Sequence, residues 1–419
     1  AEVPRGAICQ LSVDFETGVS ESVWRGRVTL HNGVGPQHIL SAYDLVAAAS
    51  SRSAFIGADE SELFYHCTED STHTAALTAL WTAGSSTVLT FGSPPQHERE
   101  TGKDGAVLVT PASGADPFIL TYTGKSGNEL TGVSTTGQFG TTATNAAAGS
   151  TVQEVCWIED SPPNVAAKIL TSTGTGTNGS YDTLPASWGF AMPVALLDVP
   201  GISRAVIAMN PASGSHSVRV VSTTAQPQGL AWLQSVLQRY GVWLTMRQAQ
   251  ITARVAIDRW ATVPTAVLTL GPNQILRAIP ARSIYDASTT LEYGLVKTVY
   301  SSGFRSSGGT LPRTRPAKQI YLQDFGYEVY QNQTNIADRI NERLAAWYTR
   351  VPTVIDLQTT LVCAQLCPGD WIVIAHLGLW TQTNPGAGPD YAMVGAISVD
   401  WQAGVVSLRL YIQHRPEDA

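Results

Sequence analysis

Alternation of apolar and polar residues predicts β-strands near both ends of the chain. Ala7–Asp14 and Trp24–Leu30 place every second side chain on an apolar face, as half-buried antiparallel strands do. Near the other end, Tyr391–Asp400 and Val405–Ile412 are expected as strands of a β meander, joined by a short Trp-Gln-Ala-Gly connection. We therefore expect antiparallel β structure at both ends.

The stretch from Leu77 to about Val155 changes character and becomes rich in Gly, Ser and Thr. Short apolar runs punctuate it, and the candidate strands are Thr87–Phe91, Ala106–Thr110, Phe118–Tyr122 and Thr151–Ile158. Turns are expected at Gly124–Gly127 and Gly137–Gly140. This pattern predicts a small all-β insertion.

Helical periodicity appears in two places. One stripe ends at Gly241, a residue suited to ending a helix, and consists of Leu230, Leu233, Val236, Leu237 and Tyr240. A strand pair follows it, with a turn near Arg247–Gln250. The second amphipathic helix runs from Asn335 to Trp347. Pro36–Ser53 favours a short helix or a buried crossover, and Leu291–Tyr300 favours a strand.

Composition narrows the class of protein. The chain has 419 residues, which suggests about two to four domains. Its 43% hydrophobic and 14% charged residues predict a globular protein, and we find no apolar run that approaches a membrane span. The net charge of −7 disfavours a surface that binds phosphates. Arg305–Lys318 is interpreted as a solvated Pro/Gly loop, with a weak anion contact as the minor alternative.

The five cysteines do not predict a disulfide framework or a metal centre. Cys363 and Cys367, with His376 nearby, lack the four closely spaced ligands of a closed site. If Leu361–Cys367 is extended, both sulfurs lie on one strand face, where buried apolar thiols are the commoner explanation. A second cluster is interpreted as a polar loop and consists of His66, Cys67, Glu69, Asp70 and His73. We expect no metal and no cofactor.

Ile169–Asp198 combines turn formers with anchoring aromatic residues. Its Thr/Gly/Asn/Ser run offers loop conformations, and bulky residues such as Tyr181 and Trp188 follow. Asp182 is the titratable group that most invites a chemical role. We expect it instead to fasten two domains to each other.

This segment resembles the "STG…G.YD.LP..WG" segment of bacteriophage tail hub proteins, a family related to the trimeric baseplate hub of contractile phages. The matching residues are Ser172, Thr173, Gly174, Asn178, Gly179, Tyr181, Asp182, Leu184, Pro185, Trp188 and Gly189. Phe118–Ala143 resembles a recurring tail module, except that Ser134–Gly137 replaces its Thr-Arg-Gly step and Asn145 stands near the usual His. Leu366–Ile374 is similar to the "l.pGD.v.v" turn and strand of hub barrels, where Asp370 is expected to bond backbone amides.

The resemblance implies an α+β, mainly β fold with tail-tube-like β-barrel domains, a helix–hairpin unit and a small all-β insertion. The expected domains are N-terminal barrel strands (1–76), the insertion (77–158), the hub linker loop and helix–hairpin domain (159–260), strands with an amphipathic helix (261–350), and a C-terminal meander that completes a barrel (351–419). Some tail-tip relatives hold iron–sulfur clusters, but these cysteine spacings do not predict one.

The function that the resemblance implies is structural. Such a hub forms the distal ring of the tail channel, usually as a homotrimer, and connects the tail tube to a central tip or fibre. The expected partners are the distal tail protein, the tail tube or tape measure protein and the fibre, with genome DNA passing through without specific binding.

Two other functions are weighed against this one. A hydrolase would need a pair of carboxylates, and the spacing of Asp116, Glu129, Asp182 and Asp198 singles out no pair. We therefore expect no enzymatic activity. The alternative is a protein that binds a host receptor or a surface glycan through the 77–158 insertion.

Overall fold

The computed structural model describes residues 8–14, 20–34, 37–44, 73–139, 141–209, 218–222, 229–239, 241–247, 250–255, 266–283, 293–300, 303–308, 318–322, 353–375 and 390–413. In these residues the protein is α+β and mainly β, with several sheets and few helices. None of the sheets described there closes into a barrel. A search of the same residues finds no helix with the length and hydropathy of a membrane span.

The N-terminal sheet has the order β1-β2-β3. β1 (Ile8–Asp14) and β2 (Ser20–Val34) pair in antiparallel fashion and confirm the two predicted strands. β3 (Gln37–Asp44) pairs with β2 from Val34↔Gln37 onward. Of the two alternatives for Pro36–Ser53, a short helix or a buried crossover, the helix is wrong for Gln37–Asp44, because the backbone there bonds to a neighbouring strand. Residues 45–53 lie outside the described part.

The insertion is a β structure with its own core. Its strands are β4 (Thr74–Ala76), β5 (Val88–Thr90), β6 (Gly105–Thr110), β7 (Phe118–Tyr122), β8 (Gly124–Ser126) and β9 (Glu129–Thr131), followed by β10 (Thr151–Asp160). The four predicted strands are confirmed. The predicted turn at Gly124–Gly127 is partly wrong, because Gly124–Ser126 pairs with β9. Trp81 and Phe118 meet in the core at a ring-centroid distance of 5.6 Å.

Strand β10 continues from the insertion into the next part of the chain. Its first half, Thr151–Val155, pairs with β6, and its second half, Cys156–Asp160, pairs with β11 (Val218–Ser222). Helix α2 (Pro162–Thr171) begins two residues after the strand ends. A single extended segment thus joins the insertion to the helices.

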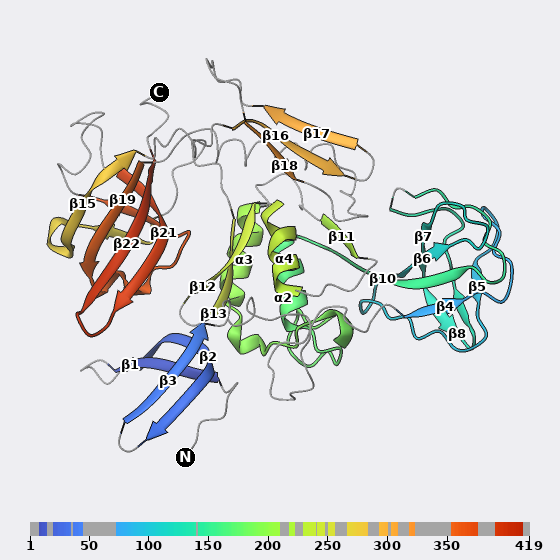
Figure 1. Ribbon diagram of the computed structural model, residues 1–419, viewed down its shortest axis with the longest axis horizontal. Helices are drawn as coiled ribbons and strands as arrows, with labels where there is room; N and C mark the ends of the chain where they lie inside the picture. The colour runs from blue at the N-terminus through green and yellow to red at the C-terminus, as the bar shows by residue number, and fades with distance from the viewer. Residues whose placement is uncertain are drawn as a thin grey trace.

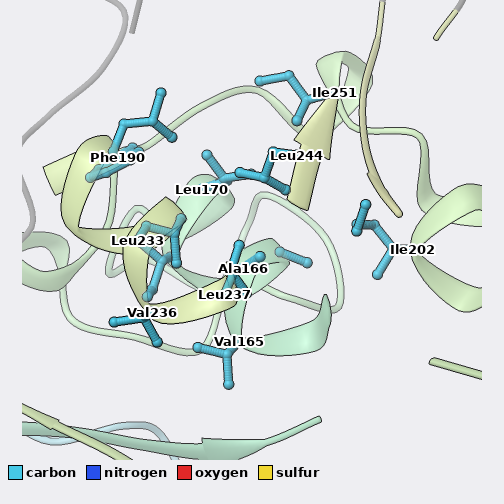
Figure 2. Packing of buried hydrophobic residues seen from close by; sticks show 14 of the residues in the cluster. Val165, Ala166, Leu170, Phe190, Ile202, Leu233, Val236, Leu237, Leu244 and Ile251 are labelled. Carbon is cyan, nitrogen blue, oxygen red and sulfur yellow. The ribbon is translucent and has the colours of Figure 1, made fainter. Parts of the chain in front are cut away.

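The central part, here called the helical unit, packs three helices against a β-hairpin (Figure 2). Its elements are α2, α3 (Val199–Met209), α4 (Gly229–Arg239), β12 (Val242–Arg247) and β13 (Gln250–Val255), with the 3-10 turns η1 (Ala186–Trp188) and η2 (Val194–Leu196). The predicted helix and hairpin are α4 and β12–β13. Helices α2 and α3 were not predicted.

Helix α2 begins at two prolines, which fit the first turn of a helix because the amide they lack has no partner there. Leu170 of α2, Leu233 of α4 and Leu244 of β12 share the buried cluster that Figure 2 shows. Burial of such a stripe is the main source of helix stability in proteins. The mutual packing therefore accounts for the helical unit better than local propensity does.

The C-terminal sheet has the order β14-β20-β21-β22-β19-β15. Its strands are β14 (Leu268–Leu270), β15 (Ile275–Ser283), β19 (Thr353–Thr360), β20 (Trp371–Ile374), β21 (Asp390–Asp400) and β22 (Val405–Gln413). The 3-10 turns η3 (Pro272–Gln274) and η4 (Leu361–Gln365) flank them. The meander is confirmed, whereas an extended Leu361–Cys367 is wrong because η4 occupies most of it.

A separate sheet has the order β17-β16-β18, from β16 (Tyr293–Tyr300), β17 (Gly303–Gly308) and β18 (Lys318–Leu322). Arg305 belongs to β17, so the basic segment begins in a strand rather than in the expected loop. The helix expected over Asn335–Trp347 lies outside the described residues. In Figure 1 the helices stand between the insertion, at the right, and the C-terminal sheet, at the left.

Candidate functional site

The segment after α2 is organised around the carboxylate of Asp182, which is 5% exposed. One carboxylate oxygen accepts the amide of Thr173 (2.7 Å), and the other accepts the Thr173 hydroxyl (2.6 Å) and the amide of Asn178 (2.9 Å). Burial opposes ionisation, but these hydrogen bonds outweigh it and lower the pKa of Asp182. The expectation that Asp182 fastens two domains is corrected: its hydrogen bonds close its own loop, from Thr173 to Asp182.

Asn178 completes the closure of the same loop. Its side-chain amide donates to the carbonyls of Thr171 (2.8 Å) and Met192 (2.7 Å), and its oxygen accepts the amide of Val194 (3.0 Å). The end of α2 and the start of η2 are thereby held by one side chain. Such bonds satisfy carbonyls and amides that irregular backbone would otherwise leave unpaired.

The loop also packs closely against itself. Gly174 has φ +77°, and a Cβ atom there would lie 2.5 Å from the amide nitrogen of Ala186. Trp188, which follows in η1, is fully buried in the core of the helical unit. Gly174 is therefore required by both conformation and space, and Trp188 anchors the loop as expected.

A strap of the insertion, residues 97–101, attaches to this loop and to α2. Glu100 accepts hydrogen bonds from Lys168 Nζ (2.7 Å) and from the hydroxyl of Thr183 (2.9 Å). Lys168 also pairs with Asp160 at 2.9 Å. Burial alone would lower the pKa of Lys168, but the two carboxylates raise it. Lys168 thus stays charged at the junction between the two units.

Two further hydrogen bonds attach the strap. The hydroxyl of Ser187 donates to Glu98 Oε2 (2.6 Å), and the amide of Thr101 donates to the carbonyl of Thr183 (2.9 Å). The strap therefore bonds to both ends of the Tyr181–Trp188 stretch. The resemblance motif lies at the contact between the insertion and the helical unit.

A second junction joins the hairpin to the C-terminal sheet. Arg254 Nη2 of β13 donates to Asp370 Oδ1 (2.5 Å) and to Cys367 Sγ (2.6 Å). Asp370 Oδ2 accepts the amide of Cys367 (2.9 Å), which confirms the expected backbone bond. Gly369 has φ +88°, and a Cβ there would lie 3.1 Å from Arg254 Cγ. The Pro-Gly-Asp turn is thus shaped to receive the guanidinium, a contact that the sequence did not predict.

The carboxylates considered for catalysis belong to different elements and loops of the chain. Asp116 is exposed, and Glu129 accepts a hydrogen bond from Thr90 at 3.5 Å. Asp198 accepts the amide of Gly201 (2.9 Å) near the start of α3. The contacts of Asp198 and Asp182 are of the kind that cap a helix or close a loop.

The candidate metal ligands are distributed among different environments. Cys156, Cys363 and Cys367 are buried cysteines, and burial raises the pKa of Cys367 to about 11. Among the residues that the structure describes, no group of three or more His, Cys, Asp or Glu side chains is arranged to hold a metal ion. Cys67 and His376 lie outside those residues. His73 is not simply a loop residue, because its Nε2 lies 4.0 Å from the buried Glu154.

Sequence reasoning missed Glu98, Glu100, Lys168 and Arg254. A usable signal existed for Lys168, a lone charge in the otherwise apolar run VAAKIL that could have been recognised as a buried helix face. Its partner Glu100 lies 68 positions away, which no local pattern reveals.

Comparison with known proteins gives one kind of match. No family model matches the chain, and no curated protein does. The chain is similar to a solved chain titled "Virion of native gene transfer agent (GTA) particle", with 14% identity, 85% of this chain and 87% of that chain covered, and a TM-score of 0.37.

Two crystal structures give weaker matches. One is the tail protein from Neisseria meningitidis MC58, with 8% identity, 81% of this chain and 96% of that chain covered, and a TM-score of 0.30. The other is the 43 kDa tail protein of prophage MuSo2 from Shewanella oneidensis, with 12% identity, coverage of 83% and 98%, and a TM-score of 0.26. All three titles name tail or virion proteins, at TM-scores that do not by themselves establish a common fold.

Proposed function

We propose that this chain is a structural protein of a phage tail, the hub of the tail tip or baseplate. It forms the distal ring of the tail channel and connects the tail tube to a central tip or fibre. The observation that carries the proposal is that the hub-like motif lies where the insertion bonds to the helical unit. Asp182 and Asn178 of that motif make hydrogen bonds that close the loop. The same stretch bonds to the strap of the insertion.

The proposed partners follow from this role. The chain assembles as a homotrimer whose domains complete barrel-like rings with neighbouring subunits, since the open sheets described here leave edges that assembly would cover. Other tail proteins, namely the distal tail protein, the tube or tape measure protein and the fibre, contact this ring. Genome DNA passes through without specific binding, which suits a net charge of −7.

The assembly state tests the proposal directly. We expect light scattering on the purified chain, or on the chain with its tail partners, to give three times the monomer mass of 44.6 kDa. Electron micrographs should show rings. A stable monomer that forms no ring and joins no virion would contradict the hub.

We also propose that the chain has no enzymatic activity. The carboxylate of Asp182 accepts hydrogen bonds from Thr173 and Asn178 that hold it ionised, and an ionised carboxylate cannot act as a general acid. Asp198 accepts the amide of Gly201 near the start of α3. Release of soluble products from peptidoglycan or capsular polysaccharide by the purified chain, lost in Asp182→Asn, would overturn this.

Binding of a host glycan through the insertion is the alternative. The insertion closes upon itself, since the amide of Leu77 donates to the carbonyl of Ser150 (2.9 Å), so it can be removed at residues 78–149 and the ends rejoined. Such a deletion spares β10, which the helical unit also uses. Glycan-array signal that disappears in this variant, with assembly intact, would favour the alternative.

A further inference from the structure

The strap covers a buried carboxyl group whose hydrogen bonding is incomplete. Glu154 of β10 is 1% exposed, and its Oε1 accepts the amide of Glu98 (2.8 Å). Its Oε2 makes no hydrogen bond of normal geometry, and His73 Nε2 lies 4.0 Å from it. A charged carboxylate in this position would lack the partners that buried charges need. The neutral, protonated form fits the site better.

Other titratable and charged groups surround this position. The strap contributes His97, Glu98 and Arg99, and the neighbouring β7 and β8 contribute Tyr122 and Lys125. Most are already engaged: the Tyr122 hydroxyl donates to the carbonyl of Glu98 (2.9 Å), and Lys125 Nζ donates to the carbonyl of His97 (2.5 Å). Their hydrogen bonds support the backbone of the strap and not the second oxygen of Glu154.

Burial is the largest cause of the pKa shifts of Glu154 and His97. It raises the pKa of Glu154 to about 8, opposed by the backbone amides of Glu98 and His73 and by the charge of Lys125, and aided by the charge of Glu98. Burial also lowers the pKa of His97 to about 4, with the charge of His73 acting in the same direction. Near neutral pH, Glu154 therefore holds a proton and His97 does not.

We propose that the strap is a proton-operated latch: residues 97–101 stay docked on the helical unit while Glu154 is protonated, and undock when its proton leaves for solvent. Ionisation places a charge beneath the strap, next to the carboxylate of Glu98. Hydration of that charge requires the strap to lift. Its bonds to Ser187 and Thr183 are then lost, which frees the strap from the Tyr181–Trp188 stretch. This inference rests on the junction itself and not on the proposed function.

The direction of the pH dependence follows from proton linkage. Between the ordinary value of 4.5 and about 8, docked Glu154 binds a proton that the undocked form releases. Docking therefore weakens by up to about tenfold per pH unit as pH rises through this window. His97 acts oppositely between about 4 and 6.5, where docking excludes a proton. The two effects offset each other below pH 6.5, and a net loss remains between 6.5 and 8.

Hydrogen exchange on the full chain tests the latch. The amides of Glu98 and Thr101 report docking, because one bonds to Glu154 and the other to Thr183. From pH 6.5 to 8 we expect their protection factors, corrected for the intrinsic rate, to fall by up to about 30-fold. Amides in the β6–β7 pairing should keep their protection and serve as the internal reference.

Two variants sharpen the test. Glu154→Gln keeps the shape of the side chain but cannot ionise. It should abolish the fall in the protection factors of the Glu98 and Thr101 amides. Asp116→Asn, at an exposed carboxylate of the same insertion, should leave it unchanged. Constant protection of Glu98 and Thr101 in the wild type between pH 6.5 and 8 would overturn the latch whether or not Glu154→Gln folds. Retention of the fall in a folded Glu154→Gln protein would overturn it too.

Discussion

The two junctions of the helical unit are built on different principles. The insertion is attached by several hydrogen bonds spread over a strap, with Glu100–Lys168 as their charged centre. In the described part of the chain, the side-chain hydrogen bonds from the hairpin to the C-terminal sheet come from one guanidinium, Arg254, seated on the turn at Asp370, with the Trp243 ring beside Gly369. A distributed junction can lose one bond and persist, whereas a single-point junction cannot. We therefore expect the first to be adjustable and the second to be fixed.

Both junctions depend on the core of the helical unit. A cavity in that core should lower the free energy of unfolding more than any other change considered. Trp188 is fully buried in the cluster formed by α2, α3 and α4. Trp188→Ala should cost about 3–5 kcal/mol of unfolding free energy, because a large cavity remains. Urea unfolding of the helical unit, followed by circular dichroism, measures it.

Trp401 provides the matched control, since it is 38% exposed in the β21–β22 connection. Trp401→Ala should change the midpoint of urea unfolding little. A similar shift in both variants would show that Trp188 is not an anchor of the loop.

Removal of Asp370 should break the single-point junction. Asp370→Ala leaves the Arg254 guanidinium, whose side chain is 17% exposed, without its carboxylate. We expect a cost of about 3 kcal/mol, near the lower end for a broken buried pair because some solvent reaches the arginine. Hydrogen exchange of β13 and β20 should increase together.

The exposed pair Asp356–Arg409, at 2.9 Å, is the control for this variant. Asp356→Ala should leave exchange in β13 and β20 unchanged, since exposed pairs contribute little. If Asp370→Ala also leaves those strands protected, the junction does not depend on this ion pair.

Substitution of Glu100 should weaken the distributed junction less. Glu100→Gln removes one carboxylate, but Lys168 keeps Asp160 as a partner. The expected cost is about 1–3 kcal/mol, measured as increased exchange of the Thr101 amide. Glu129→Gln, elsewhere in the insertion, should have no such effect. If Glu100→Gln costs as much free energy as Asp370→Ala, the two junctions do not differ in the way stated above.

Asp182→Asn should give the smallest change, about 1 kcal/mol at neutral pH. Its amide oxygen can still accept the Thr173 hydroxyl and the Asn178 amide, and only the Thr173 amide loses its acceptor. Its diagnostic effect is on acid stability. The lowered pKa of Asp182 means that its contribution is present above the ordinary value of 3.8 and is lost as pH falls below it. The wild type should thus lose more stability than Asp182→Asn below pH 4 in thermal melts.

Prediction from sequence succeeded where a local pattern carried the information. The alternating strands β1, β12 and β22 and the stripe of α4 were recognised because one buried face fixes a period of two or of 3.6 residues. The missed helix α2 is buried on nearly every side, as Ala166 and Ile169 illustrate, so little polar contrast marked it. Helix α3 does bury one stripe, but the exposed Ile207 on its other side weakens the pattern. Gln37–Asp44 was assigned wrongly because its pairing with β2 decides its conformation.

By itself, the sequence determined the β-rich character of the chain and identified Asp182, Trp188 and Asp370 as structural residues of turns and loops. Only the tertiary structure decided the junctions, since Lys168 meets Glu100 across 68 positions and Arg254 meets Asp370 across 116. The physical reason is the range of the forces. Turn chemistry and burial periodicity act between near neighbours, whereas a buried charge is stabilised by whatever partner the completed fold brings within hydrogen-bond distance.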